Sequence, residues 1–160
     1  MWKRWLSMFA LAVWFGGFTF YSAIVVPIGD SVLDSDLLQG LITRRVTLWL
    51  NGAGVITLVL WAGVVWEEGR LAPRKMRRTA WTMLGLLVVT QLTLLFLHPQ
   101  LEARIVFDPP SIRERGTFRS LHAIYLQVST LQWLFIAIFL GVLLRIWRAA
   151  DARAAEEAAR

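Results

Sequence analysis

The sequence predicts an all-α integral membrane protein that folds as a four-helix bundle. Of its 160 residues, 57% are hydrophobic, and the mean hydropathy is +0.56. A soluble chain of this length is less apolar, because it needs a polar exterior. The apolar residues form four blocks that lack charged side chains, each close to the ~20 residues with which an α-helix crosses a bilayer. A chain this short forms one domain, so we expect the four helices to pack together.

The first predicted crossing runs from Trp5 to Val26 and ends before Pro27. A cleavable signal peptide is the competing interpretation, but this apolar stretch is longer than the ~7–15 residues of a signal h-region. Gly16 and Gly17 lie inside the crossing, where small residues allow close helix contact. We expect them to contact another helix, and a ligand seat is the alternative.

The second predicted crossing runs from Val46 to Trp66. The segment 31–45 before it is too polar to span a membrane, and we expect a short helix there that lies at the interface. Ser35 or Asp36 can cap that helix, because both types accept hydrogen bonds from free N–H groups of a first turn.

The third predicted crossing runs from Thr79 to His98, with Pro99 as its terminator, and the fourth from Ser120 to Leu144. The loop between them predicts an interfacial half-helix followed by a rigid break at residues 108–110. The predicted organisation is therefore a transmembrane domain over residues 1–147 and a charged, Ala-rich tail over 148–160. We expect the tail to continue the last helix into water.

Lys and Arg are distributed unevenly between the two predicted sides of the membrane. Eleven lie on the side of both termini and of the loop between crossings two and three, and six lie on the other side. Short cytoplasmic loops carry the excess of positive charge, so both termini are predicted to be cytoplasmic. The net charge of +6 is explained by this topology, and we expect no nucleic-acid partner, since no such motif occurs.

Uncharged polar residues inside the crossings are the first group of candidate functional residues. The third and fourth crossings each carry a polar stripe, and we expect the two stripes to face each other. Such side chains often serve only as hydrogen bonds between helices. The predicted intramembrane polar residues are Asn51, Gln91, Tyr125, Ser129 and Gln132.

The two histidines are the second group, because a membrane hairpin places both near one surface. His98 closes the third crossing and His122 opens the fourth. Each can have a structural role, such as capping a helix, bonding a loop carbonyl or pairing with Glu102 or Asp108. Two facing imidazoles can instead ligate copper, zinc or a haem iron, so haem and copper are the candidate cofactors.

The loop after the third crossing is the third candidate. Arg113, Arg115 and Arg119 are predicted to bind anionic lipid headgroups, and a solvated run of charges is the alternative. No residue is proposed as catalytic, because Ser120 and His122 are two residues apart and project in different directions from a helix. The chain also lacks cysteine.

Three motifs carry a resemblance to a known family. They are Trp-Phe-Gly-Gly at 14–17, the segment His98 to Arg104, and Phe-Arg-Ser-Leu-His at 118–122. With these the chain resembles bacterial members of the transmembrane protein 205-like domain family. The resemblance implies a four-helix membrane protein without an assigned biochemical activity. The host implied is a bacterium, so the predicted location is its inner, cytoplasmic membrane.

A weaker resemblance is to the copper resistance protein D-like membrane domain, which also combines a Trp-x-Gly-Gly helix with membrane histidines. Here the first crossing has no histidine, and no methionine accompanies His98 or His122. Two hypotheses follow. The first is a non-enzymatic bundle that binds lipid or a membrane-protein partner, or assists a transporter. The second is a haem- or copper-binding module that uses the two histidines. A homo-oligomer that acts as a channel or carrier is a further alternative.

Overall fold

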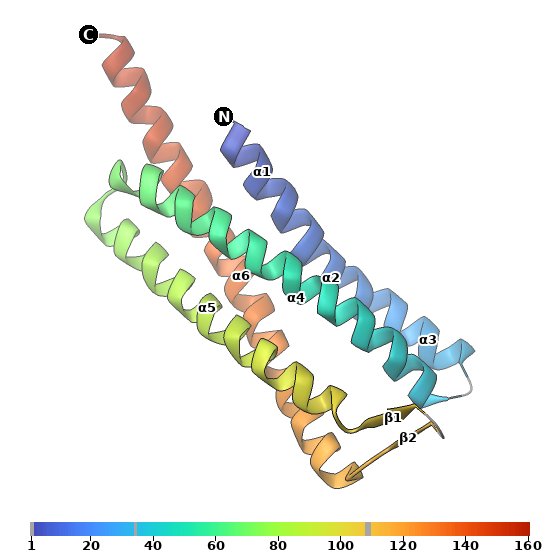
Figure 1. Ribbon diagram of the computed structural model, residues 1–160. Coiled ribbons are helices and arrows are strands. Elements are labelled where there is room, and N and C mark those ends of the chain that lie inside the picture. The colour runs from blue at the N-terminus through green and yellow to red at the C-terminus, as the bar shows by residue number, and fades with distance from the viewer. Residues whose placement is uncertain (1, 34, 108–109) are drawn as a thin grey trace.

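The computed structural model describes residues 2–33, 35–107 and 110–160 and confirms the all-α class (Figure 1). Four helical stretches of the described chain are long and apolar enough to cross a membrane. They cover Trp2–Val32, Leu37–Arg70, Arg74–Glu102 and Arg115–Ala158. Each is longer than the crossing predicted for it, because polar residues at both ends continue the helix.

The first stretch is one continuous helix with two wider π-helical turns. Its parts are α1 (Trp2–Leu11), η1 (Ala12–Gly16), α2 (Gly17–Phe20), η2 (Tyr21–Val25) and α3 (Val26–Val32). The helix continues through Pro27, where the sequence predicted its end. A proline ring clashes with the carbonyl four residues earlier in a regular helix. In η2 the N–H of Val26 bonds to the carbonyl of Tyr21 five residues earlier, and this wider turn makes room for the ring.

Helix α4 (Asp36–Glu67) joins two segments that were predicted as separate helices. The expectation of a distinct interfacial helix is therefore wrong. Residues 41–51, where the two predicted segments meet, contain no Pro or Gly that would interrupt the helix. Ser35 is the cap, since its hydroxyl accepts a long hydrogen bond of 3.5 Å from the N–H of Leu38. The turn η3 (Glu68–Arg70) then connects α4 to α5.

Helix α5 (Arg74–Glu102) continues past Pro99, so Pro99 is not the terminator. A proline one turn from the end of a helix removes a single hydrogen bond, and its own carbonyl still accepts from the N–H of Ala103. The half-helix expected next is also wrong. Strands β1 (Ile105–Phe107) and β2 (Pro110–Ile112) form an antiparallel hairpin in which Ile105 pairs with Ile112. The predicted break at Asp108 and Pro109 lies outside the described residues.

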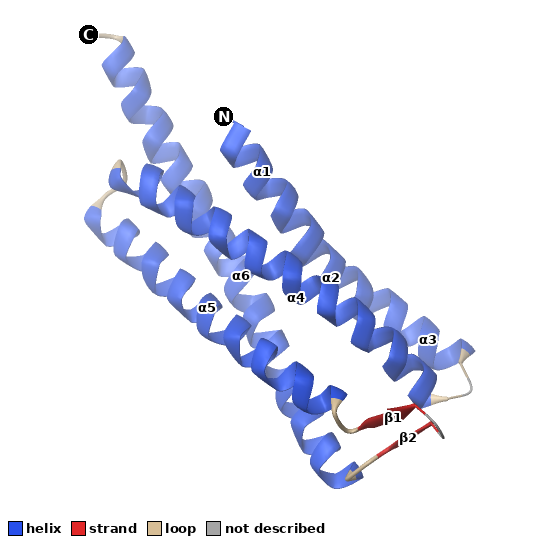
Figure 2. Ribbon diagram, in the orientation of Figure 1, coloured by secondary structure: helices blue, strands red, loops and turns tan. Residues whose placement is uncertain are grey.

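Helix α6 (Arg115–Ala158) follows Glu114, a residue with left-handed backbone (φ 48°). The helix includes almost all of the tail, so the prediction that the tail continues the last helix is confirmed. Both termini lie at one end of the molecule, together with the α4–α5 turn; we call this the terminal end (Figure 1). The strands lie at the opposite end, here called the hairpin end, next to the α3–α4 connection (Figure 2).

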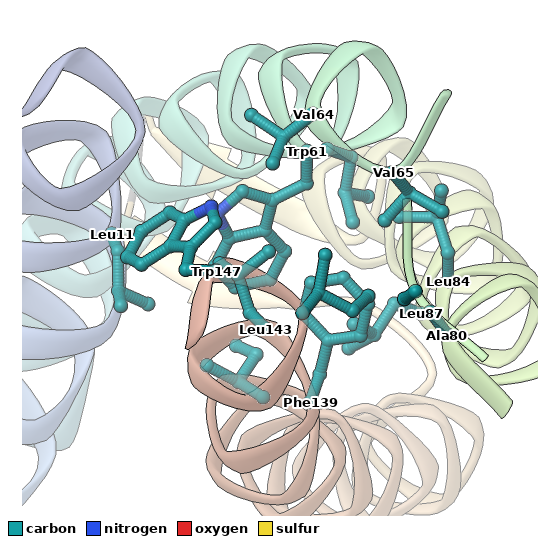
Figure 3. Packing of buried hydrophobic residues seen from close by; sticks show 14 of the residues in the cluster. Leu11, Trp61, Val64, Val65, Ala80, Leu84, Leu87, Phe139, Leu143 and Trp147 are labelled. Carbon is teal, nitrogen blue, oxygen red and sulfur yellow. The ribbon is translucent and has the colours of Figure 1, made fainter. Parts of the chain in front are cut away.

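The main apolar core lies in the terminal half of the bundle. Figure 3 shows how side chains from several helices pack together in it. Trp61 and Phe139 are completely buried, with ring centroids 4.6 Å apart, and Leu87 and Leu143 pack with them in the same core. A smaller cluster at the hairpin end contains Leu94, Leu97 and Tyr125. In lipid such clusters stabilise the fold through close packing, because lipid tails are as apolar as the side chains.

Candidate functional site

A buried polar layer separates the two apolar clusters. On α5, Leu87 belongs to the main core and Leu94 to the smaller cluster, and Thr90 and Gln91 lie between them. On α6, Gln132 lies between Tyr125 and Ile136 in the same way. Along α5, Gln91 is 13 residues from Arg78, or about 20 Å at 1.5 Å per residue, so the layer lies within the apolar part of the helix. We define the polar layer as Asn51, Thr90, Gln91, Tyr125 and Gln132, all of which are buried.

Hydrogen bonds connect the polar layer across three helices. Gln132 Nε2 donates to Gln91 Oε1 at 3.0 Å, which links α6 to α5. Gln91 Nε2 donates to the backbone oxygen of Asn51 at 3.2 Å, which links α5 to α4. Asn51 Nδ2 donates to the hydroxyl of Tyr125 at 3.2 Å, which links α4 to α6. A longer contact of 3.4 Å joins Gln132 to Thr90 Oγ1.

Four of the five polar residues predicted inside the membrane are thus brought together. Ser129 is buried on the same side of α6, but its hydroxyl has no hydrogen-bond partner among the described residues. Gln127, also on α6, is exposed. The amides of the polar layer therefore hold α4, α5 and α6 together.

The first helix closes against this layer at Gly54, a contact that the sequence did not reveal. A Cβ atom on Gly54 would lie 2.6 Å from Gln91 Oε1 and 2.7 Å from Trp14 Cε2, closer than side chains approach. Gly54 therefore lets the buried Trp14 ring and the Gln91 amide approach α4 together. The predicted contact glycines differ: a Cβ on Gly17 would meet Leu50 at 3.1 Å, whereas Gly16 has nothing within 4 Å.

Two polar contacts connect the first helix to its neighbours nearer the hairpin end. Tyr21 donates a hydrogen bond of 2.7 Å to Thr43 Oγ1 on α4. Trp133 Nε1 on α6 donates to Thr19 Oγ1 at 2.9 Å, and its ring stacks on Phe15 at 5.2 Å. The only signal in the sequence was the polar character of these side chains inside an apolar segment.

His98 is placed between α5 and α4 at the hairpin end. Its Nε2 lies 3.3 Å from the backbone oxygen of Arg44, and its Nδ1 lies 3.9 Å from Glu102 Oε2. Glu102 also forms an ion pair with the Arg44 side chain. Glu102 is one of the structural partners that the sequence suggested, whereas the carbonyl near Nε2 belongs to helix α4 and not to a loop.

His122 has a different environment, although it also lies at the hairpin end. It is exposed, and its ring stacks on Phe118 with centroids 5.9 Å apart and planes 7° from parallel. Among the described residues, no three His, Asp or Glu side chains gather in a way that could hold a metal ion. His98 Nε2 thus lies at the Arg44 carbonyl and the His122 ring beside Phe118, so the two histidines have separate environments.

The predicted headgroup arginines lie on the surface of the hairpin end. Arg113, Arg115 and Arg119 are exposed. Two nearby carboxylates have other partners: Glu102 pairs with Arg44, and Glu114 lies 3.5 Å from Arg104. Within the described chain, no carboxylate lies within ion-pair distance of the three predicted arginines.

Ion pairs also join the helices at the terminal end, and the sequence analysis did not find them. Arg4 contacts Glu68 at 2.6 Å and Asp151 at 2.8 Å, which links α1, η3 and α6. Lys3 pairs with Glu67 at 2.6 Å. The adjacent pairs Lys3-Arg4 and Glu67-Glu68, both at the predicted cytoplasmic side, were the available signal.

The model of one family, described as a domain of unknown function (DUF4149), matches residues 9–104. The chain belongs to the DUF4149 family. The match begins in α1 and ends just after α5, so the DUF4149 region contains Trp14, Asn51, Gly54, Gln91 and His98. Helix α6, which supplies Tyr125, Gln132 and His122, lies outside the matched residues. No curated protein and no solved structure shows significant similarity to the chain.

Proposed function

We propose that this DUF4149 protein is a non-catalytic membrane protein that binds anionic lipid at its surface. The observation that carries the proposal is the way the polar side chains inside the membrane are used. Asn51, Gln91 and Gln132 bond one another or Tyr125 and thereby hold α4, α5 and α6 together. The polar side chains of the interior thus have a structural role, and we assign binding to the surface of the molecule.

The charge at the hairpin end supports lipid binding there. Arg113, Arg115 and Arg119 are exposed and have no carboxylate partner in the described chain, so their charges are free for lipid phosphates. A shallow groove of about 450 Å³ on α4, lined in part by Arg44 and Arg45, opens at the same end. Both features lie where headgroups meet the helix ends.

The setting that we propose is a bacterial cytoplasmic membrane with both termini in the cytoplasm. The Lys and Arg distribution supports this orientation, and the likeness to bacterial transmembrane protein 205-like domains supports the host. Several further points stay predictions. They are the residue ranges of the domain and its tail, the formation of a homo-oligomer, the binding of a membrane-protein partner and a transport-accessory role.

The haem or copper hypothesis has less support. It requires His98 and His122 to turn toward a shared ligand, and His98 would have to leave the Arg44 carbonyl. The hypothesis stays a prediction with a direct spectroscopic test, given in the Discussion.

The proposal is tested by lipid binding to the detergent-purified protein, measured by native mass spectrometry. We expect phosphatidylglycerol to bind about tenfold more tightly than phosphatidylcholine, with a preference that weakens as salt rises. The variant with Arg113, Arg115 and Arg119 all replaced by Gln should lose most of the preference that arises at the hairpin end. Equal binding of the two lipids by the natural protein would refute lipid recognition by charge.

A further inference from the structure

A basic groove lies on α5 at the terminal end, far from the arginines considered above. Its volume is about 480 Å³, and one face of the first three turns of α5 lines it. The lining residues are Arg74, Lys75, Arg78, Thr79, Thr82 and Met83. Along the helix, three cations come first, two hydroxyls follow, and a methionine lies deepest, so polarity falls toward the membrane.

The cations of this groove lack an acidic partner in the described part of the chain. Three carboxylates at this end of the bundle, Glu67, Glu68 and Asp151, are engaged by Lys3 and Arg4. No acidic side chain of the described chain lies within ion-pair distance of any of the three groove cations. Three neighbouring positive charges without counter-charges favour an anion from outside the chain.

Aromatic side chains place the groove at the depth of lipid headgroups. Trp66 and Trp81 pack edge to face with centroids 6.5 Å apart, and both are exposed near the terminal end. Exposed tryptophans concentrate at the membrane–water interface. Trp81 lies one helical turn beyond Arg78, so the cations are at the phosphate level and Met83 is at the level of the acyl chains.

We propose that this groove binds the phosphate of an anionic phospholipid in the leaflet at the terminal end. Arg74, Lys75 and Arg78 contact the phosphate, Thr79 and Thr82 lie beside the glycerol, and Met83 contacts an acyl chain. The site goes beyond the function proposed above, because it lies in the opposite leaflet and shares no residue with the arginines of the hairpin end.

The first test removes the groove charges and measures phosphatidylglycerol affinity by native mass spectrometry of the full chain. The variant is Arg74→Gln/Lys75→Gln/Arg78→Gln, and its control, Arg145→Gln/Arg148→Gln/Arg153→Gln, removes three exposed cations from α6 at the same end. We expect the groove variant to bind about tenfold more weakly and the control to change by less than about threefold. Equal losses of phosphatidylglycerol affinity in the two variants would mean that the lipid responds to surface charge in general, and this result would overturn the proposed site.

A second test fills the groove without changing any charge. Thr82→Phe should weaken phosphatidylglycerol binding several-fold, whereas Leu86→Phe, one turn further along α5 and outside the lining, should not. Phosphatidylcholine and inorganic phosphate are the comparison ligands. Complete displacement of the lipid by millimolar inorganic phosphate would contradict a lipid site, because the acyl contact would then contribute nothing.

The variant of the hairpin end separates this proposal from the preceding one. If only the Arg113, Arg115 and Arg119 variant loses lipid, the groove proposal fails and lipid binding at the hairpin end stands. If only the groove variant loses lipid, the groove proposal stands alone. If neither variant changes binding, both proposals fail.

Discussion

Gln132 on α6 donates a hydrogen bond of 3.0 Å to the amide oxygen of Gln91 on α5, in the middle of the bundle. The nitrogen of the same Gln91 amide donates to the backbone of Asn51 on α4. Both ends of one buried amide thus connect three helices, and Gln91 is the centre of the polar layer. The first prediction concerns this pair.

Replacing Gln91 or Gln132 by Leu should destabilise the protein by about 1–2 kcal/mol each, since either change leaves a buried amide group without its partner. The double variant should cost less than the sum of the two, with a coupling of about 0.5–1.5 kcal/mol. Reversible unfolding in mixed detergent and sodium dodecyl sulfate measures all three. Gln127→Leu on exposed α6 surface is the control and should be neutral. Strictly additive costs would show that the two amides do not bond.

Gly54→Ala should destabilise by about 1–3 kcal/mol, because the new methyl group overlaps the buried Trp14 ring and the Gln91 amide. Gly52→Ala, on the same helix with nothing within 4 Å of its Cβ position, is the matched control and should be neutral or slightly stabilising. Circular dichroism is used to follow unfolding, because the signal of Trp14 cannot be separated by fluorescence in a chain with nine tryptophans. A neutral Gly54→Ala would mean that Trp14 does not lie against α4.

Arg4→Gln should loosen the first helix, because Arg4 joins Glu68 and Asp151 and is half-buried. We expect a cost of about 1 kcal/mol and faster proteolysis or hydrogen exchange in residues 2–11. Lys3→Gln is the comparison, and its half-exposed pair with Glu67 should contribute about 0–0.5 kcal/mol. The reverse order of the two effects would contradict the arrangement of the terminal end.

Protein purified from cells supplied with haem and copper should show no Soret band and no stoichiometric metal. The reason is that His98 is engaged by the Arg44 carbonyl and lies near Glu102, while His122 stacks on Phe118. The absorption spectrum and elemental analysis of the natural protein, compared with His98→Ala and His122→Ala, decide the matter. A Soret band or bound copper that either substitution abolishes would establish the ligand hypothesis instead.

The sequence predicted the fold class and the four apolar helices because membrane helices are defined by length and hydropathy, which are local properties. It did not predict how far the helices extend beyond the apolar segments. Pro27 and Pro99 were interpreted as terminators, but a π turn accommodates the first and the second lies within the last helical turn. The hairpin of β1 and β2 was missed because two three-residue strands carry too little periodicity to detect.

Four of the five residues of the polar layer were predicted from the sequence, and Thr90 was missed. Gln91, Tyr125 and Gln132 are conspicuous in apolar segments, and the stripe on the last helix followed from helical spacing. No pattern in the sequence connected Asn51 to its partner, since Tyr125 lies 74 residues further along the chain. Gly54 could not be singled out from the other glycines, because its importance depends on where Trp14 lies in three dimensions.

The central claim is that the interior of this DUF4149 protein holds the bundle together and its basic surface binds anionic lipid. The most direct measurement is the preference for phosphatidylglycerol over phosphatidylcholine, determined by native mass spectrometry in one detergent. The proteins compared are the natural protein, the surface variant at Arg113, Arg115 and Arg119, the surface variant at Arg74, Lys75 and Arg78, and Gln91→Leu. The account predicts that each surface variant lowers this preference and that folded Gln91→Leu retains it. A preference that is unchanged in both surface variants and disappears in folded Gln91→Leu would contradict it, because the ligand would then occupy the interior.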